Sequence, residues 1–514
     1  MNNNHDAEFD VIVVGGGPGG STVATFVAMQ GRRVLLLEKQ AMPAYKIGES
    51  LLPATVHGIC PMLGVSKAIQ EANFMPKLGG TFRWGKGDKT WDFLFSVSSK
   101  MPGPTSTAYQ VERMKFDTIL LDNARKKGVD VREQHSVTDV LMEDGRVAGL
   151  VFTDDSGIVR RARARYVVDA SGHQTSLARL SGERIYSKYF QNLALFGYFH
   201  GGGRLPAPNQ GNIFCISFEH GWFWYIPLTD TLTSVGAVVA KELGSLLTNG
   251  HEATLNEFIR ACPPVQRLLA NATRVTSGPY GELRVRKDYS YSHTKFWVPG
   301  MVLVGDSACF IDPVFSSGVH LATYSALLAA RSINTCLRNE LDEQRCFSEF
   351  EARYRREYAL FYDFLLAFYD LNNDLDSYFW HARRVTSSPE IGNRAFIDLV
   401  AGVAGSGENL YSSPEEFFRQ REGLGKLLFP QSVDDGAGAR KPIEPKGAEF
   451  YASLVSEVVQ LQAQATLREQ RPAETPLFPG GLVASPDGLH WREVASSQAA
   501  GSGTMGEKYD VGRL

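Results

Sequence analysis

The sequence predicts an α/β fold that combines a parallel sheet with a separate antiparallel sheet. Near the start, an apolar, β-branched run at residues 9–14 stops at glycines, and a helical stretch and a second apolar run at 33–37 follow it. A strand, glycine turn, helix and strand within roughly 30 residues form a βαβ unit, which opens a parallel sheet. Residues 185–295 are rich in aromatic and β-branched side chains, which favours antiparallel strands.

The same patterns predict the other elements along the chain. Alternating hydrophobicity with turns at Gly145 and near Gly157 predicts a β-meander. In chain order we expect a strand at 9–14, a helix at 21–30, a strand at 33–37, the meander from 129, strands at 166–169 and 301–304, a helix at 318–337, and mainly helical chain beyond 338.

With 514 residues the chain is too long for one simple core, so we expect several structural units. The elements of the parallel sheet are spread over the sequence, which makes the first unit discontinuous. We assign residues 1–75, 109–182 and 295–337 to the parallel-sheet domain, 76–108 and 183–294 to the antiparallel-sheet domain, and 338–514 to a C-terminal region.

Composition excludes some classes of function. The formal net charge is −3 and no Lys/Arg-rich run occurs, so we expect no nucleic-acid binding, which usually requires a basic face. The six cysteines are scattered without a CxxC pair, and we expect no metal site. Residues 1–8 are polar, unlike a signal peptide, and no apolar run is long enough for a membrane span. We therefore expect a cytoplasmic protein.

The turn after the first strand has the GxGxxG pattern, with Gly15, Gly17 and Gly20 in the three glycine positions. The first glycine permits the tight turn, the second lets the backbone approach a pyrophosphate, and the third allows close helix–strand packing. The following helix presents its N-terminal N–H groups to the anion. Glu38, at the end of the second strand, stands where a ribose-binding acid belongs. Together these features predict a dinucleotide site.

Three later segments resemble the glutathione-reductase-like FAD family: VLVGDSA at 302–308, QVER ending at Arg113, and DASG at 169–172. The resemblance implies a glutathione-reductase-like (p-hydroxybenzoate-hydroxylase-like) FAD-binding Rossmann domain with an antiparallel β-sheet substrate domain and a helical C-terminal part. It implies that Asp306 contacts the ribityl chain and that Arg113 lies beside the cofactor. Aromatic hydroxylases have an Asp-Gly pair where this chain has DASG.

Three further segments resemble the flavin-dependent halogenases. WFWYIP at 222–227 matches their WxWxIP signature, KIGESLLP at 46–53 resembles their GES loop beside the flavin, and DPVFSSGV at 312–319 resembles their halide-binding loop. These matches cover roughly residues 9 to 330. By this resemblance, the following residues line the site: Glu49, Ser50, Gly318 and Val319 at the cofactor, Ser317 and Gly318 at the halide, and Trp222, Trp224, Ile226 and Pro227 in a tunnel wall.

The wall also has a physical basis, because Trp222, Trp224 and Ile226 share one face of a strand. In the family this wall keeps the substrate away from the flavin. The resemblance implies that reduced FAD and oxygen form a C4a-hydroperoxide, from which chloride generates hypochlorous acid. Lys77 occupies the place of the family's essential lysine, which passes the halogen to the substrate.

One departure bears on the substrate. Tryptophan halogenases have a glutamate in the Pro-x-x-Ser segment, where this chain has Phe315. A phenol or pyrrole is more electron-rich than the indole position that the glutamate helps to activate. The resemblance therefore implies a phenolic, tyrosyl-like substrate, carried by a carrier protein in natural-product (antibiotic) biosynthesis, with FADH2 supplied by a separate flavin reductase.

Alternative functions are a pyrrolyl-specific halogenase and an FAD-dependent aromatic monooxygenase (hydroxylase). Dependence of the product on free chloride separates a halogenase from a hydroxylase. A non-catalytic flavoprotein-fold binder, similar to the Rab GDP-dissociation inhibitors, would need neither Lys77 nor the Gly305-Asp306 pair.

Overall fold

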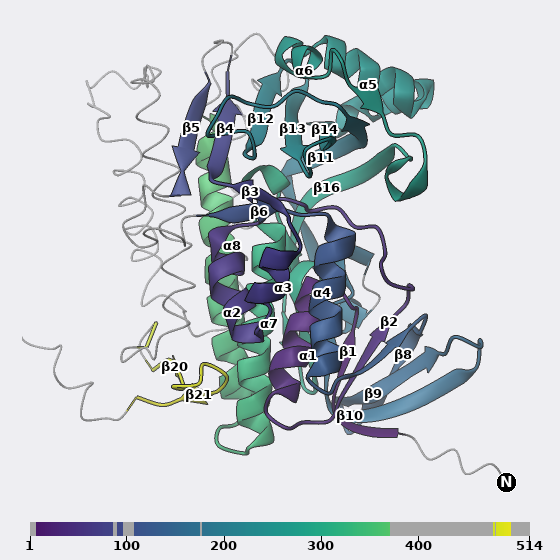
Figure 1. Ribbon diagram of the computed structural model, residues 1–514. Coiled ribbons are helices and arrows are strands. Elements are labelled where there is room, and N and C mark those ends of the chain that lie inside the picture. The colour runs from purple at the N-terminus through teal and green to yellow at the C-terminus, as the bar shows by residue number, and fades with distance from the viewer. Residues whose placement is uncertain are drawn as a thin grey trace, which may run out of the picture.

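Two large sheets and a pair of long helices form most of the described part of the molecule (Figure 1). In the computed structural model, the described residues are 7–85, 90–95, 107–174, 177–370, 476–477 and 480–494. The parallel sheet lies in the lower half of Figure 1 and the larger sheet lies above it. The sequence's α/β prediction is confirmed.

The first sheet has the strand order β17-β18-β10-β1-β2-β7, with β8 and β9 attached beside β10. Its central strands run parallel, as the βαβ pattern predicts, and β17 and the β8–β9 hairpin add antiparallel pairs. The strands are β1 (Ala7–Val14), β2 (Val34–Glu38), β7 (Asp130–Glu133), β8 (Ser136–Glu143), β9 (Arg146–Thr153), β10 (Val159–Asp169), β17 (Trp297–Val298) and β18 (Met301–Leu303).

Three helices cover this sheet: α1 (Pro18–Ala28), α4 (Arg113–Lys126) and α7 (Gly318–Leu337). Helix α1 begins three residues earlier than the sequence analysis placed it. Pro18 occupies its first turn, where the fixed φ of proline suits a helix start and the missing N–H costs no hydrogen bond. The glycine turn therefore leads directly into the helix N-terminus.

The second sheet has the order β19-β16-β11-β14-β13-β12-β4-β5, with β15 beside β11. Its strands are β4 (Gly79–Arg83), β5 (Trp91–Leu94), β11 (Arg184–His200), β12 (Ile213–Phe218), β13 (Gly221–Pro227), β14 (Leu232–Ala240), β15 (Thr273–Arg274), β16 (Arg284–His293) and β19 (Cys309–Phe310).

Two features of this sheet differ from the expected antiparallel domain. Strands β4 and β12 pair in parallel, although they come from distant parts of the sequence. Strand β19 belongs to a segment that we assigned to the parallel-sheet domain, yet it pairs with β16. The chain crosses between the sheets here, directly before helix α7.

The two faces of this sheet belong to different hydrophobic clusters. Trp222, Trp224 and Ile226 on β13 pack into the cluster shared with the parallel sheet and its helices. Phe223 and Tyr225 point to the other face, which the short helices α5 (His251–Arg260) and α6 (Pro263–Leu268) cover. This alternation confirms that the two tryptophans and the isoleucine share one face.

Shorter elements connect the sheets. The π-helix η1 follows the segment at 46–53, and β3 pairs with β6 beside it. The short helices and strands are η1 (Ala54–Ile59), α2 (Cys60–Leu63), α3 (Ser66–Glu71), β3 (Met75–Lys77), β6 (Ala108–Gln110), η4 (Gly172–Gln174), η5 (Leu177–Ser181), η6 (Lys241–Asn249), η7 (Gly278–Tyr280), η8 (Gly305–Ser307) and η9 (Pro313–Phe315).

Helix α8 (Glu343–Asp370) packs along α7, and a short two-stranded sheet, β20 (Val483–Ala484) with β21 (Trp491–Arg492), lies against both helices (Figure 1). The region that we expected to be mainly helical thus contains strands as well as the long α8. Most of that region, at 371–475 and 495–514, lies outside the described residues.

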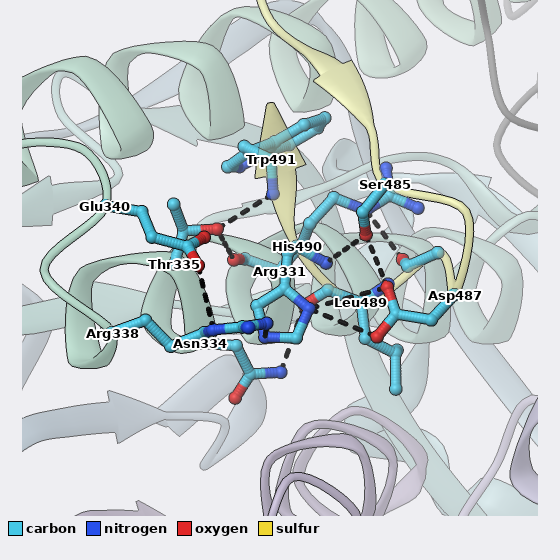
Figure 2. Close-up of polar contacts among 11 residues, drawn as sticks. Arg331, Asn334, Thr335, Arg338, Glu340, Ser485, Asp487, Leu489, His490 and Trp491 are labelled. Atoms are coloured by element: carbon cyan, nitrogen blue, oxygen red, sulfur yellow. Dashed lines mark hydrogen bonds and ion pairs between the residues drawn. The ribbon is translucent and has the colours of Figure 1, made fainter. Parts of the chain in front are cut away.

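Figure 2 shows how the β20–β21 segment is fixed to α7. The Trp491 indole N–H donates to Ser332 Oγ and its backbone N–H donates to Thr335 Oγ1, both at 2.8 Å. Arg331 Nε donates to the Gly488 carbonyl oxygen at 2.8 Å, and Asn334 Nδ2 donates to the carbonyl oxygen of the next residue, Leu489. These bonds join residues more than 150 positions apart in the sequence, so no local pattern predicts them.

All six cysteines are buried and unpaired, as expected of core thiols. Among the described residues, no helix has the length and apolar character needed to traverse a bilayer.

Candidate active site

The glycine turn between β1 and α1 has the geometry that its sequence predicts. Gly15 has a φ of +102°, which side-chain-bearing residues rarely adopt. A Cβ on Gly20 would lie 1.9 Å from the Gly15 carbonyl oxygen, so this contact requires glycine. A Cβ on Gly17 would meet nothing within 4 Å. The open space at Gly17, beside the N-terminus of α1, fits the pyrophosphate of a dinucleotide.

Glu38, at the end of β2, binds the same turn. Its Oε2 accepts the Gly16 backbone N–H at 2.7 Å, and its Oε1 accepts the Gln40 backbone N–H at 2.9 Å. The buried carboxylate therefore fixes the turn to the second strand. A carboxylate oxygen can accept a further hydrogen bond, so these contacts leave the predicted ribose contact open.

The two later FAD-type motifs meet at the ends of the adjacent strands β10 and β18. Asp169 Oδ1 accepts hydrogen bonds from Ser171 Oγ at 2.6 Å and from Ser307 Oγ at 3.2 Å. Asp306 follows β18 and is half-buried. Its burial raises its pKa to about 6, against the guanidinium groups of Arg113 and Arg184, which favour the carboxylate. In open parallel sheets, ligands bind at this carboxyl edge.

Arg113 connects helix α4 to the 46–53 segment. Its Nε and Nη2 bind the Asp117 carboxylate at 2.8 and 2.9 Å, and its Nη1 donates to the carbonyl oxygens of Ile47 and Gly48. The guanidinium is thus held by a bidentate ion pair. Its position over the GES loop brings it to the expected neighbourhood of the cofactor, and contact with the cofactor remains a prediction.

Glu49 of the GES loop is 2% exposed. Its Oε1 accepts the Tyr198 hydroxyl at 2.7 Å, and Tyr198 also hydrogen-bonds the hydroxyl of the half-buried Tyr45. Its Oε2 has no hydrogen-bond partner among the described residues. Burial raises the pKa of Glu49 to about 7, although the Tyr198 hydroxyl favours the charged form. The sequence analysis named Glu49 and missed both tyrosines, which come from distant segments.

Lys77, at the end of β3, is 1% exposed. Its Nζ donates to Ser50 Oγ at 2.9 Å and to the Leu51 carbonyl oxygen at 3.0 Å, and it lies 5.5 Å from the centre of the Phe95 ring. Burial lowers the pKa of Lys77 to about 7. The structure therefore places a dry amine, partly neutral near pH 7, directly against the GES loop.

The segment at 312–319 forms a tight turn before α7. Asp312 Oδ1 accepts the Val314 backbone N–H at 3.1 Å, and Ser316 has a φ of +60°. Ser317 is buried, and its Oγ has no hydrogen-bond partner among the described residues. A Cβ on Gly318, the first residue of α7, would meet nothing within 4 Å. An unpaired hydroxyl, open space and a helix N-terminus fit a small anion.

The wall residue Trp222 contacts the end of α8, where its indole N–H donates to the Tyr369 hydroxyl. Trp222 is 1% exposed, and its ring centre lies 6.4 Å from that of Trp84. Phe315, in the place of the halogenase glutamate, packs against Phe82 and Phe368 with ring centres 6.3 and 4.8 Å away. The surroundings of Phe315 are therefore aromatic and apolar.

Comparisons with known proteins agree with this geometry. A family model described as tryptophan halogenase matches residues 10–104 and 98–434. The chain is 34% identical over 411 residues to a tryptophan 2-halogenase from Chondromyces crocatus, which covers 77% of this chain and 76% of the relative.

A carrier-protein chlorinase and a solved halogenase structure are also similar to this chain. A 1H-pyrrole-2-carbonyl-[peptidyl-carrier protein] chlorinase from Pseudomonas fluorescens is 30% identical, over 71% of this chain and 85% of the relative. The solved myxobacterial chondrochloren halogenase, an FAD-dependent halogenase, is 51% identical and superimposes with a TM-score of 0.75. That superposition covers 95% of this chain and 100% of the other.

Proposed function

Because this chain belongs to the family of flavin-dependent halogenases, we propose that it chlorinates a phenolic, tyrosyl-like ring tethered to a carrier protein. Enzymes of this family use FADH2 and a halide. When bound, FADH2 supplies the two electrons for the reaction of oxygen, chloride and a proton that gives FAD, hypochlorous acid and water. The buried Lys77 amine against the GES loop carries the proposal.

The chain's own residues would divide the work between two centres. The glycine turn, Glu38 and Asp306 would hold FAD, with Arg113 fixing the GES loop over it. The N–H groups at the start of α7, with Ser317, would hold chloride in a dry setting where such donors act strongly.

Lys77 would act on the substrate side of the site. A neutral amine can take up electrophilic chlorine as a chloramine, and a protonated one can donate a hydrogen bond to hypochlorous acid. With a pKa of about 7, Lys77 has both forms available near neutral pH. The wall formed by Trp222, Trp224 and Ile226 would keep the aromatic ring from reaching the flavin.

The choice of a phenol rests on Phe315 and on the relatives. An apolar side chain in place of a glutamate gives no help to an unreactive ring position, which favours an electron-rich ring. The chondrochloren halogenase shares 51% of its residues with this chain. Tethering is supported by the relative that acts on a carrier-bound pyrrole, which also makes a pyrrolyl group the second candidate substrate.

The test is mass spectrometry of carrier-bound tyrosyl and pyrrolyl groups incubated with the enzyme, reduced FAD, oxygen and chloride. A mass shift of one chlorine for hydrogen on the tyrosyl carrier is expected. Chlorination of only the pyrrolyl carrier would instead identify the pyrrolyl group as the substrate. A hydroxylated product that does not depend on chloride would overturn the halogenase proposal for this chain.

Lys77→Ala should abolish chlorinated product while flavin reoxidation continues, because the amine is needed after the flavin has reacted. Lys77→Arg should also be inactive, since a guanidinium stays protonated and cannot readily form a chloramine. Product yield and flavin absorbance are followed together in a single turnover. Lys67→Ala is the control, because the Lys67 side chain is 86% exposed. Normal chlorination by Lys77→Ala would remove Lys77 from the mechanism.

A further inference from the structure

We propose that Tyr369, in the last turn of α8, is a positioning residue that sets the shape of the chloride-binding turn at 312–318. The inference rests on the proposed function, because it concerns how well that turn holds a halide. Tyr369 is 1% exposed and lies 51 positions beyond Gly318 in the sequence. No motif identifies it.

The Tyr369 hydroxyl forms a bridge between the wall and the turn. The Trp222 indole N–H donates to the Tyr369 hydroxyl oxygen at 2.7 Å, and the Tyr369 hydroxyl donates to Asp312 Oδ2 at 3.0 Å. An indole N–H can only donate and an ionised carboxylate can only accept, so a hydroxyl that does both is suited to join them. Phenylalanine would fill the same space and make neither bond.

Asp312 is the end of the bridge that shapes the turn. It is fully buried, and its carboxylate accepts from Asn192 Nδ2 at 3.0 Å, from Tyr369, and from the Val314 backbone N–H at 3.1 Å. The bond to Val314 begins the short helical turn η9. A buried carboxylate depends on such donors, so removing the one from Tyr369 should disturb the others.

The residues downstream depend on that anchor. Ser316 is held at a φ of +60°, which is unfavourable for serine and persists only where its surroundings enforce it. Ser317 and Gly318, which would hold the halide, follow at once. If the bond from the Val314 N–H to Asp312 weakens, the turn should relax and its N–H groups should bind chloride less well.

Phe368, the residue before Tyr369, provides a second contact between the end of α8 and the turn. Its ring packs against Trp84 at 4.5 Å and against Phe315 at 4.8 Å between ring centres. The end of α8 thus contacts both the second sheet and the turn through two adjacent residues, Phe368 by ring packing and Tyr369 by its hydroxyl hydrogen bonds. A Tyr369→Phe variant would keep the aromatic ring at position 369 and lose only its hydroxyl. It therefore isolates the contribution of the hydroxyl.

The experiment compares the chloride dependence of Tyr369→Phe with that of wild type. Loss of one hydrogen bond to a charged group should raise the chloride KM roughly tenfold. At saturating chloride, kcat should stay within about twofold, because Lys77 is untouched and Trp222, which loses a hydrogen bond, keeps its ring packing against Trp84 and Trp224. At low chloride, more of the oxygen should end as hydrogen peroxide.

Tyr362→Phe is the matched control. Tyr362 lies on the same helix, is equally buried, and its hydroxyl hydrogen-bonds Ser187 Oγ at 2.7 Å, away from the turn. It should lose similar thermal stability with no change in chloride KM. Equal chloride KM values for Tyr369→Phe and wild type would overturn the inference, as would an equal rise in Tyr362→Phe.

A second measurement separates this inference from the proposed function. Chloride- and bromide-induced shifts in melting temperature report halide binding without turnover. A shift in wild type that is reduced in Tyr369→Phe supports the inference even if no carrier substrate is chlorinated. In a double-mutant cycle, Asp312→Asn and Tyr369→Phe should be strongly non-additive in that shift. Additive effects would show that Tyr369 acts apart from Asp312.

Discussion

At the scale of the residue, the site depends on ionisable side chains that the fold removes from water. Lys77, which donates to Ser50, and Glu49, which precedes Ser50, are both buried, and burial moves the pKa of each to about 7 from opposite directions. The amine loses its proton and the carboxyl keeps its proton more readily than in water. Both groups therefore change charge within the range in which an enzyme of this kind would work.

This charge change predicts a pH dependence for halogen transfer. The neutral fraction of Lys77 rises as the pH passes through about 7, so product formed per turnover should increase from pH 6 to 8 and then level. Rapid-quench single turnovers with saturating chloride give the profile.

Glu49 titrates in the same range and requires a control. Glu49→Gln should keep the midpoint of the profile, whatever its absolute rate, if Lys77 is the titrating group. A profile that becomes flat in Glu49→Gln would instead assign the dependence to Glu49.

Lys77 also links stability to pH. Between about 7 and 10.5 the unfolded chain binds a proton at this side chain that the folded chain does not. The free energy of unfolding should therefore gain up to about 1.4 kcal/mol per pH unit from this group as the pH rises, and below pH 7 its contribution should not change.

At the scale of the element, helices α7 and α8 connect the turn at 312–318, the wall and the β20–β21 segment, which lies beside the two helices in Figure 1. Helix α7 begins at Gly318 and contacts Trp491 further along, while the last turn of α8 carries Tyr369, which binds Trp222 of the wall. Trp491 is 2% exposed and also lies under the guanidinium groups of Arg331 and Arg353. The late segment therefore helps to hold the helix pair in place.

Trp491→Ala should destabilise the protein by about 3–5 kcal/mol, the range for removing a buried tryptophan or phenylalanine from a core. Trp491→Phe should cost less, because it keeps much of the packing and loses only the indole hydrogen bond to Ser332. Urea unfolding of both variants gives the comparison. Equal stability of Trp491→Ala and wild type would mean that the β20–β21 segment does not support the helices.

At the scale of the whole molecule, segments from three distant parts of the chain meet at the carboxyl edge of the parallel sheet. The glycine turn, the Asp169 loop and the Asp306 turn follow strands β1, β10 and β18, which lie side by side. Trp222, Trp224 and Ile226 of the second sheet belong to the same hydrophobic cluster as these three strands. The GxGxxG turn that follows a predicted strand, at 15–20, lies in the first of these segments.

This arrangement predicts that FAD bound to the protein is not reduced directly by NADH or NADPH, since no second GxGxxG pattern follows a later predicted strand in the sequence. The absorbance of bound FAD should stay unchanged under anaerobic NADPH and bleach only when a flavin reductase is added. Reduction with dithionite is the control that the bound flavin is accessible. Rapid bleaching by NADPH alone would favour the hydroxylase alternative.

The sequence by itself determined the features that are encoded within a few residues. Gly15 and Gly20 are required by a positive φ and a 1.9 Å approach, so the pattern alone predicts the turn. The alternation that places Trp222 and Trp224 on one face follows from the two-residue period of a strand. The halogenase motifs gave the family in the same way, because each is a short run with fixed spacing.

The tertiary structure alone decided which distant residues complete those motifs. The parallel pairing of β4 with β12, the crossing of β19 into the second sheet, and the contact of Tyr369 with Trp222 across 147 positions have no local signal. Local patterns reflect backbone geometry and burial over a few residues. The partner of a buried polar group depends instead on which surfaces pack together, and that is fixed only when the whole chain has folded.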